Sequence, residues 1–435
     1  MKEKSPNFKI RKLGKPTIPS PITSGYFMTD NKRILYDPYL HSDSPRTAEE
    51  PPLSIEVAGP RKTIYFDPLQ TKAAIVTCGG LSPGINDVIR AVVMGLYYRY
   101  GVKEILGIRY GFQGLVPEYG HKPVVLTPEV VKDIHALGGS ILSSSRGSQD
   151  ITTIVDTLCE MNIDIFFCVG GDGTMRAAER IAAEIRKRNI KMGVIGIPKT
   201  IDNDLNLIDK TFGFDTAISM VVNAIKCAHV EAKGAPMGIG LVKIMGRESG
   251  HIVLNATLAQ NDVNFALIPE VSFDLEGEKG LLEVLEKRLL ERKHAVILVA
   301  EGAGQDLYVG NEPRLTDASG NIRLQDIGTY LKKQIEGYFK KTEMEINLKY
   351  IDPSYTIRSV PANASDSIYC ELLGQFAVHA GMAGKTDLVV GLFKGEYVHL
   401  PLKSVASRKK VNTKGNLWMR VLEATGQPAL MKNER

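Results

Sequence analysis

The chain has 435 residues, of which 43% are hydrophobic and 24% are charged, a composition typical of a globular protein with two or three domains. No apolar run approaches the roughly 20 residues that span a bilayer, which argues against a membrane role. The net charge of +5 is modest, and basic residues are dispersed among acidic ones. Nucleic acid is therefore not expected as a partner, whereas a phosphorylated small molecule is.

The five cysteines include no CxxC pair, and most lie in apolar runs, where they are typical of small buried residues. They are Cys78, Cys159, Cys168, Cys227 and Cys370. The N-terminal segment is basic but has no apolar central region, and the last residues match no retention signal. We therefore expect a reduced, cytoplasmic compartment.

Residues 1–70 are rich in proline and poor in helical periodicity. Such a composition favours an extended arm over a packed domain. We expect this N-terminal arm to lie along the globular body or to reach a neighbouring subunit.

From Lys72 onward, short apolar runs alternate with amphipathic stretches. They predict helices over residues 85–100 and 174–188, and strands over 73–77, 164–170, 191–198, 238–245, 265–270 and 294–302. This alternation is typical of an α/β protein whose mainly parallel sheets are covered by helices. We expect two Rossmann-like three-layer α/β/α domains: residues 71–213 with a return segment over about 360–405, and 214–359 with a C-terminal segment over about 406–435.

Glycines and charged residues follow several of the predicted strands directly. In parallel sheets the carboxyl ends of the strands carry the loops that bind ligands. The residues at these positions are Gly79 and Gly80, Gly170 to Thr174, Lys199 to Asp204, Gly246 with Arg247, and Glu301 with Gly302.

The first of these loops, "CGGLSPGIND", has the composition of a phosphate cradle. Glycine lets backbone N–H groups approach an anion, and the helix that begins near Gly84 adds its positive end. A tight turn between strand and helix explains the loop equally well, because its spacing matches neither GxGxxG nor GxxxxGK[ST].

The second loop, "GGDGT", leaves Asp172 as its only charged side chain. Mg²⁺ typically binds one or two carboxylates together with substrate phosphates and water, so Asp172 is a candidate magnesium ligand. The alternative is that Asp172 caps a helix that begins near Thr174.

The third loop, "PKTIDND", places Asp202 and Asp204 two residues apart. In an extended segment both side chains would point the same way, with Asn203 opposed. Two like charges so close are costly without a cation or a role. The pair suits kinase chemistry, in which one carboxylate accepts a proton from a hydroxyl and another supports the metal.

Six sequence motifs, in a fixed order along the chain, resemble those of a known family. From about Lys72 to Gln427 the chain resembles the 6-phosphofructokinases of the long branch, which includes pyrophosphate-dependent enzymes and ATP-dependent relatives. The resemblance is carried by "GGDGT", "PKTIDND", "TFGFDTA", "KIMGRESG", "VAEGAGQ" and "YIDPSYTIR". It implies transfer of the terminal phosphoryl group of Mg-ATP to the 1-hydroxyl of fructose 6-phosphate in glycolysis, with residues 71–213 binding nucleotide and 214–359 binding the sugar phosphate.

The resemblance also implies residue roles. Asp202 would be the general base, Thr200 would position the phosphoryl group and Arg247 would neutralise its charge, although Arg247 could form only a surface ion pair. The implied nucleotide-binding residues are Gly79, Gly80, Arg146, Gly171, Asp172, Gly173 and Thr174, with Asp172 also holding Mg²⁺. The implied substrate-binding residues are Lys199, Asp204, Met245, Gly246, Glu301, Lys349, Tyr355 and Arg358.

Two of these assignments have simpler alternatives, since Glu301 could only cap a strand end and Lys349 could only be solvated. In the family, Lys349 would serve the site of a neighbouring subunit, which implies a homo-oligomer, expected as a tetramer with a dimer as the minimal unit. Shorter bacterial enzymes carry an arginine of their effector site where this chain has Met94. Allosteric control by the same effectors is therefore in doubt.

The phosphoryl donor depends on two residues. Pyrophosphate-dependent members typically have a second aspartate at the position of Gly173, where it would repel the α-phosphate of a nucleotide, so glycine favours ATP. Lys199 accompanies pyrophosphate use, although ATP-dependent long-branch members also combine both motifs. ATP is the expected donor. The alternatives are a pyrophosphate-dependent phosphotransferase and, more distantly, a dinucleotide-binding oxidoreductase, for which no acidic residue closes a GxGxxG unit.

Overall fold

The computed structural model describes residues 6–23, 25–39, 52–308, 316 and 322–434. These residues form two compact units. Unit 1 comprises residues 1–200, 205–213 and 361–408, and unit 2 comprises 201–204, 214–360 and 409–435. Among the described residues, no helix is long and apolar enough to cross a membrane.

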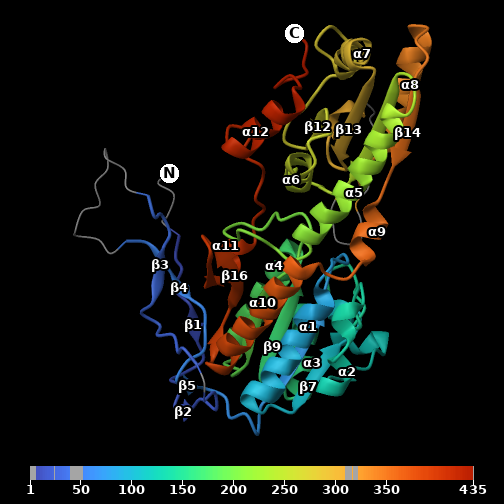
Figure 1. The fold of residues 1–435 in the computed structure, drawn as a ribbon. Coiled ribbons are helices and arrows are strands. Elements are labelled where there is room, and N and C mark those ends of the chain that lie inside the picture. The colour runs from blue at the N-terminus through green and yellow to red at the C-terminus, as the bar shows by residue number, and fades with distance from the viewer. Residues whose placement is uncertain (1–5, 24, 40–51, 309–315, 317–321, 435) are drawn as a thin grey trace. The chain divides into compact units, whose positions relative to one another are not determined.

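Unit 1 is built on a nine-stranded sheet whose centre is parallel (Figure 1). The parallel strands, in spatial order, are β16 (Leu388–Phe393), β10 (Gly193–Pro198), β9 (Ile165–Gly170), β6 (Lys72–Thr77) and β7 (Glu104–Ile108). Antiparallel strands extend both edges: β17 (Glu396–Pro401), β4 (Ser54–Val57) and β3 (Arg33–Leu35) beside β16, and β8 (Val124–Val125) beside β7. All residues of β9 and β10 are buried, as expected for central strands covered on both faces.

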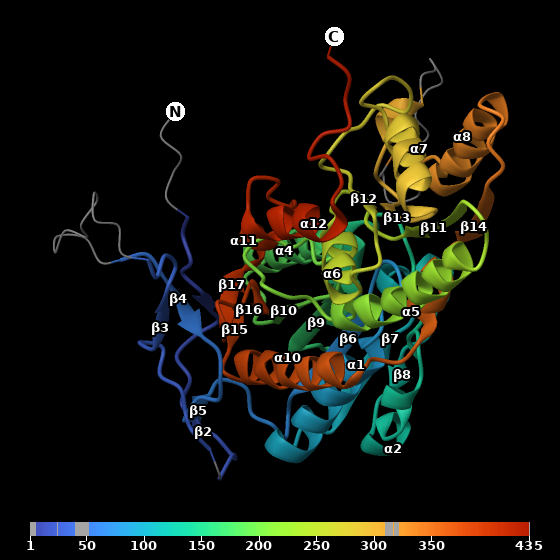
Figure 2. The same cartoon turned by 45° about the horizontal axis from the view of Figure 1, so that its top comes forward.

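Helices cover both faces of this sheet because alternate strand residues point to opposite sides. Ile75 and Phe167 pack with helices α1 (Ile85–Met94) and α10 (Ala364–Met382), which lie side by side in Figures 1 and 2. Val76 and Phe166 pack with α3 (Ile151–Glu160) and α4 (Asp172–Lys187). The result is the three-layer α/β/α arrangement expected from the sequence.

The expected helix over residues 85–100 changes its winding partway. It is α-helical to Met94 and continues as a π-helix from Gly95 to Tyr100. The apolar pattern does not distinguish these windings, since both bury a continuous face. Short helical segments also occur at α2 (Pro128–Val131), α9 (Ser354–Ser359) and α11 (Leu402–Val405).

The described part of the N-terminal arm is not a separate extension but part of unit 1. Its strands β3 and β4 continue the large sheet beyond β17. β1 (Arg11–Lys12) pairs with β15 (Lys385–Thr386), and β2 (Ile18–Pro19) pairs with β5 (Thr63–Ile64). The described part of the arm thus pairs with strands of unit 1.

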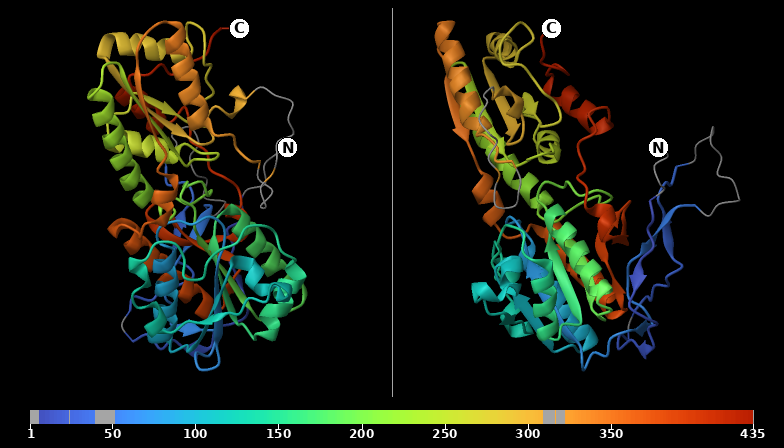
Figure 3. Two further views of the ribbon diagram at one scale, coloured as in Figure 1. Left: turned by 90° about the vertical axis from the view of Figure 1, so that its right-hand side faces the viewer. Right: turned by 180° about the vertical axis from the view of Figure 1, so that it is seen from behind.

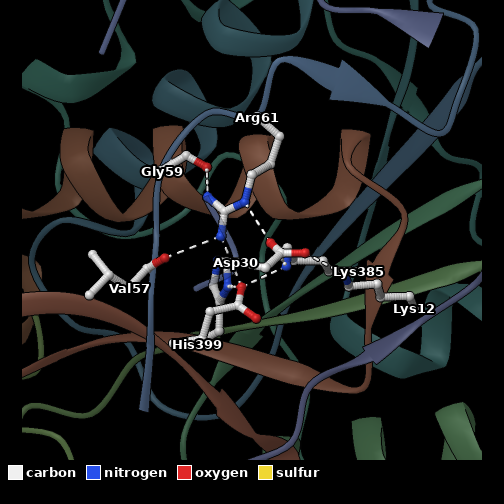
Figure 4. Close-up of polar contacts among 8 residues, drawn as sticks. Lys12, Asp30, Val57, Gly59, Arg61, Lys385 and His399 are labelled. Atoms are coloured by element: carbon white, nitrogen blue, oxygen red, sulfur yellow. Dashed lines mark hydrogen bonds and ion pairs between the residues drawn. The ribbon is translucent and has the colours of Figure 1, made fainter. Parts of the chain in front are cut away.

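A buried cluster of charges joins the arm to the sheet (Figure 4). The Glu56 carboxylate accepts hydrogen bonds from Arg61 at 2.9 Å, Lys385 at 2.6 Å and His399 at 2.8 Å. Asp30 accepts from the same arginine and lysine at 2.9 and 2.8 Å. Burial acts to raise the pKa of Glu56, but the hydrogen bonds and charges of His399 and Lys385 outweigh it and lower the pKa to about 2.

Unit 2 contains a second, fully parallel sheet. Its strands, in spatial order, are β12 (Phe265–Leu267), β13 (His294–Ala300), β11 (Gly238–Ile244) and β14 (Asn347–Ile351). One face packs with α5 (Phe214–Lys233), α6 (His251–Ala259) and α12 (Asn416–Thr425), and the other with α7 (Leu281–Arg292) and α8 (Ile327–Lys341). The yellow and orange strands between helices in Figure 3 are this sheet.

All cysteines are free thiols. Cys78, Cys168 and Cys370 are buried, as expected from their apolar surroundings, whereas Cys227 is exposed on α5. Burial raises the pKa of the Cys78 thiol to about 12, so this group stays protonated and packs as a small apolar residue.

Candidate active site

The strand order of unit 1 reverses between β6 and β9. β7 lies on one side of β6, while β9, β10 and β16 follow one another on its other side. In open α/β sheets, ligands bind outside the carboxyl ends of the strands at such a reversal. The loops that leave β6 and β9 at this point are the two glycine-rich loops singled out from the sequence.

Hydrogen bonds hold these loops together. Cys78 donates its backbone N–H to the carbonyl of Val169 at 2.9 Å, and Lys199 donates to that of Gly170 at 2.9 Å. The Lys199 ammonium group reaches across to the carbonyl of Gly80 at 2.7 Å. The ends of β6, β9 and β10 thus bring Gly79, Gly80, Gly171, Asp172 and Lys199 into one region of unit 1.

Turn geometry explains part of the first loop. Gly79 and Gly84 have φ angles of 85° and 95°, in the left-handed region that favours glycine. A Cβ at Gly84 would also lie 2.6 Å from the Cys370 sulfur. Arg146, assigned to nucleotide binding, is exposed in the loop before α3.

The glycines of the second loop differ in what requires them. A Cβ at Gly170 would lie 2.1 Å from the hydroxyl of Thr174, so this position excludes a side chain. Gly173 does not have a positive φ, and its Cβ would meet only the Arg176 guanidinium group at 3.9 Å. Packing within the protein therefore does not require a glycine at Gly173.

Asp172 is the first residue of α4, so the helix begins two residues earlier than expected. Gly171, with extended backbone, occupies the cap position and accepts the Met175 N–H at 2.9 Å. The Asp172 carboxylate accepts from the N–H of Gly173 at 2.6 Å rather than from a residue a full turn later. Asp172 thus stands in the first helical turn, where a negative charge is favourable, and not at the cap.

Two arginines hold the same carboxylate. Asp172 Oδ2 lies 2.8 Å from Arg176 Nη1 and 3.0 Å from Arg408 Nε. Burial acts to raise the pKa of Asp172, but the charge and hydrogen bond of Arg408, followed by the charge of Arg176, lower it overall. The carboxylate is therefore ionised at neutral pH, as a metal ligand must be.

A magnesium ion would fit Asp172 only together with a phosphorylated ligand. Among the described residues there is no group of three or more His, Cys, Asp or Glu side chains that could hold a metal. One ionised carboxylate beside a glycine-rich turn nevertheless suits Mg²⁺, which takes most of its remaining ligands from phosphates and water.

The expectation of an extended segment at the paired aspartates is wrong. Asn203 has a φ of 51°, so residues 201–204 form a turn and side chains do not simply alternate. Asn203 itself is buried at 6% exposure. The local sequence could not show this, because asparagine adopts either conformation and the choice is made by packing.

The carboxyl group of Asp202 is buried near the negative charges of two other carboxylates. Burial is the largest cause that raises its pKa, followed by the negative charges of Asp204 and Glu301, while Arg358 and the backbone N–H of Arg247 oppose them. The balance raises the pKa to about 7. A carboxyl group with a pKa near neutrality is matched to general acid–base chemistry.

The loops after β11 and β13 are joined backbone to backbone. Glu301 donates its N–H to Ile244 at 2.8 Å, and Gly302 donates to Gly246 at 3.1 Å. A Cβ at Gly302 would lie 1.9 Å from the Arg247 carbonyl, so the close approach requires glycine. Met245 is buried beneath this contact at 0% exposure.

Other assigned residues of unit 2 lie nearer its surface. The Arg247 guanidinium group donates to the carbonyl of Ile322. Arg358, on α9, is partly buried and its Nε has no hydrogen-bond partner among the described residues. Tyr355 is 84% exposed on the same helix, and Lys349 is exposed on β14. Asp202, Asp204, Glu301 and Arg358 thus interact electrostatically, whereas Tyr355 and Lys349 point to solvent.

Sequence reasoning missed Arg176 and Arg408. Arg176 lies four residues after Asp172, the spacing at which side chains on one helix meet, and could have been found. Arg408 stands in the basic run "SRKK" with no local motif, and 236 residues separate it from Asp172. Only the fold brings it to the carboxylate.

These features define the class of protein: an α/β protein with glycine-rich loops at the carboxyl ends of its strands and a buried aspartate whose pKa lies near neutrality. Comparison with known proteins gives the family. A family model described as phosphofructokinase matches residues 72–381. The chain belongs to the phosphofructokinase family.

Relatives along the full length agree. The chain is 49% identical to the ATP-dependent 6-phosphofructokinase of Borreliella burgdorferi, over 100% of this chain and 99% of the relative. It is 46% identical to the ATP-dependent 6-phosphofructokinase of Amycolatopsis methanolica, over 97% and 95%. It is also 46% identical to ATP-dependent 6-phosphofructokinase 1 of Arabidopsis thaliana, over 99% and 92%.

Solved structures confirm the fold. The pyrophosphate-dependent phosphofructokinase of Marinobacter aquaeolei matches with a TM-score of 0.67 at 18% identity, over 84% of this chain and 92% of that one. The phosphofructokinase of Pichia pastoris matches with a TM-score of 0.62 at 20% identity, over 84% and 38%. At these identities the likeness concerns the architecture alone.

Proposed function

We propose that this protein is an ATP-dependent 6-phosphofructokinase, which phosphorylates the 1-hydroxyl of fructose 6-phosphate and releases ADP in glycolysis. The observation that carries the proposal is Asp202, whose carboxyl group has a pKa raised to about 7 by burial, Asp204 and Glu301. The full-length relatives named as ATP-dependent enzymes support it.

In the proposed reaction, Asp202 accepts the proton of the sugar 1-hydroxyl as the oxygen attacks the terminal phosphorus of the donor. An ordinary aspartate would be a weak base at neutral pH, whereas a pKa near 7 combines an ionised fraction with a stronger drive for proton transfer. Arg247 stabilises the charge of the transferring group, and Thr200 positions it.

Unit 1 carries the proposed donor groups. Asp172 would hold Mg²⁺, which would neutralise phosphate charge on the donor. Gly79, Gly80, Gly171 and Thr174 contribute the loops that approach the nucleotide, with Arg146 at their exposed edge. Gly173 leaves open space for the α-phosphate, and its freedom from packing contacts supports this reading.

Unit 2 carries the proposed sugar-phosphate groups. Glu301 accepts hydrogen bonds from sugar hydroxyls, Met245 and Gly246 pack on the sugar, and Asp204 lies on the same loop as the base. Lys199, which belongs to unit 1, is a further proposed substrate-binding residue. Arg358 and Tyr355 bind the 6-phosphate. The Arg358 Nε, buried and without a partner among the described residues, is suited to an anion.

A homo-tetramer is part of the proposal, with Lys349 serving the site of a neighbouring subunit. Its exposure on β14 allows such a role. A cytoplasmic location is also proposed, in keeping with free cysteines throughout the chain.

Pyrophosphate is the second candidate donor, because Lys199 lies at the strand end beside Gly80. A coupled assay of the purified protein with fructose 6-phosphate and either ATP or pyrophosphate decides between them. Turnover with ATP and not with pyrophosphate is expected. Turnover with neither donor would contradict the proposed function.

A further inference from the structure

The magnesium ligand proposed above is already occupied by protein groups. Both oxygens of the Asp172 carboxylate are engaged, Oδ1 by the Gly173 N–H and Oδ2 by Arg176 and Arg408. A metal ion approaching Oδ2 therefore has to displace at least one guanidinium group. At Oδ2, a magnesium ion would compete with Arg176 and Arg408 for the same oxygen atom.

Arg408 is the stronger of the two protein competitors. Its side chain is 19% exposed and that of Asp172 is 18% exposed, whereas Arg176 is 52% exposed. Exposed ion pairs four residues apart on a helix are worth only a few tenths of a kcal/mol. A pair partly withdrawn from water is screened less, so the contact with Arg408 is the one that binding must exchange.

Backbone contacts hold the Arg408 main chain in place. Arg408 pairs with Leu205 in a β-bridge, and Asn206 donates its N–H to the Ser407 carbonyl at 3.1 Å. These bonds anchor Arg408 beside the start of α4. Rotation of the side chain alone then moves the guanidinium group within the region of the glycine-rich turn.

We propose that Arg408 is a donor-binding residue that exchanges its carboxylate for phosphate. Without nucleotide, Arg408 holds Asp172. When the magnesium nucleotide binds, Oδ2 of Asp172 passes to the metal and the guanidinium group passes to phosphate oxygens of the donor. Guanidinium binds carboxylate and phosphate with the same planar donors, so the exchange loses no hydrogen-bonding capacity. This inference rests on the proposed function of the site.

The exchange also balances charge. Asp172 with its two arginines carries one surplus positive charge. With the carboxylate bound to Mg²⁺, the Arg408 guanidinium group would face the nucleotide, whose phosphates are the most negative part of the ligand. Without Arg408, more of the phosphate charge would remain uncompensated in a partly dry site.

The test is calorimetric titration of the full-length protein with ATP, with and without Mg²⁺ and in the absence of sugar phosphate. Arg408→Gln removes the charge and keeps much of the side chain, and Arg176→Gln is the matched control on the same carboxylate. We expect Arg408→Gln to weaken Mg-ATP binding about tenfold, or ~1.4 kcal/mol, and Arg176→Gln to change it less than about threefold. Fructose 6-phosphate binding should be unchanged in both.

A purely structural role predicts a different result. If Arg408 only restrained Asp172, its loss would free Oδ2 for the metal, and Mg-ATP binding would stay the same or tighten. Either outcome overturns the proposal. Should Arg408→Gln fail to fold, Arg408→Lys keeps the charge without the planar donors, and it should bind Mg-ATP about threefold more weakly than the wild type, whereas unchanged binding would overturn the proposal.

Failure of the proposed function is visible separately in the wild-type protein. If it binds magnesium pyrophosphate but not Mg-ATP, the donor assignment is wrong, and the same variants are compared with pyrophosphate. The ratio between variant and wild type tests Arg408 in either case. A wild-type protein that binds neither donor would overturn both statements.

Discussion

The proposed proton transfer depends on a single carboxyl group, that of Asp202. Folding buries it beside two other carboxylates, so its ionised form is disfavoured relative to the unfolded chain. The folded state is therefore less stable at neutral pH than it would be with an aspartate of ordinary pKa. Such trade-offs are typical of active sites and unusual in purely structural turns.

Replacing Asp202 by Asn therefore has two expected effects. Without the proton acceptor, kcat should fall by about 10²-fold or more. Because the pKa of Asp202 is raised in the folded state, stability is lost as the pH rises toward 7, and Asn removes that loss. Asp202→Asn should melt higher than the wild type at pH 8, with the difference vanishing near pH 4. A variant that stays active, or melts lower at pH 8, would remove Asp202 from this role.

The acid limb of the pH profile tests the cause of the raised pKa. The base must be ionised, so kcat/KM should fall as the pH drops below about 7. Glu301→Gln removes one of the negative charges that raise the pKa, and the limb should move to lower pH even if KM increases. Glu248→Gln, an exposed change in a neighbouring loop, serves as the control. An unmoved limb in Glu301→Gln would show that Glu301 does not act on Asp202.

The strands differ in how well the sequence predicted them. β6, β9, β10, β11 and β13 are buried on both faces and appear in the sequence as continuous apolar runs, so they were predicted correctly. β3 and β4 were not, because they are short and lie in a proline-rich arm. β4 pairs with β17, more than 330 residues away along the chain, and β3 joins the sheet only through β4.

In the candidate site, too, local sequence predicted some residues, and others could not be predicted from it. Asp172, Asp202 and Gly173 stood out because glycines and carboxylates are unusual directly after apolar strands. The turn at Asn203 and the contact of Arg408 with Asp172 were missed, because both are decided by tertiary packing. The sequence thus indicated which loops carry chemistry, but not the partners that occupy them.

The charge cluster of the arm makes a prediction about stability. Glu56 is the shared acceptor of Arg61, Lys385 and His399, and its side chain is 6% exposed. Glu56→Gln removes the buried one of the two carboxylates that pair with Arg61 and Lys385 and leaves them only the more exposed Asp30, which should lower the free energy of unfolding by about 3 kcal/mol or more. Because the pKa of Glu56 is lowered to about 2, this stability is present above pH 4.5 and lost as the pH falls toward 2.

Chemical denaturation at pH 7 and pH 3 measures both effects. Glu104→Gln is the matched control, since Glu104 pairs with Lys72 at 3.5 Å but is 71% exposed. It should change the free energy of unfolding by less than about 1 kcal/mol. Equal effects of the two substitutions would mean that the cluster does not hold the arm to the sheet.

In the whole molecule, the phosphofructokinase family model matches residues 72–381, which include parts of both α/β units. We predict a homo-tetramer that completes each site with Lys349 of a neighbouring subunit. Arg247→Ala and Lys349→Ala should each be nearly inactive alone. Hybrids formed by mixing the two should regain activity, because some sites then receive both intact residues. A fully active monomer in light scattering, or inactive hybrids, would contradict this.

We propose that the protein uses ATP as its phosphoryl donor, and a substitution at Gly173 distinguishes ATP from pyrophosphate. The measurement is kcat/KM for ATP and for pyrophosphate at one Mg²⁺ concentration, in the wild type and in Gly173→Asp. An added carboxylate repels the α-phosphate, and each ~1.4 kcal/mol of repulsion costs a factor of ten. We predict that the wild type uses ATP, that the variant loses most of this activity, and that pyrophosphate use suffers far less. A wild type that prefers pyrophosphate would show that ATP is not the main donor. A variant that keeps its ATP efficiency would show that Gly173 does not provide space for the α-phosphate.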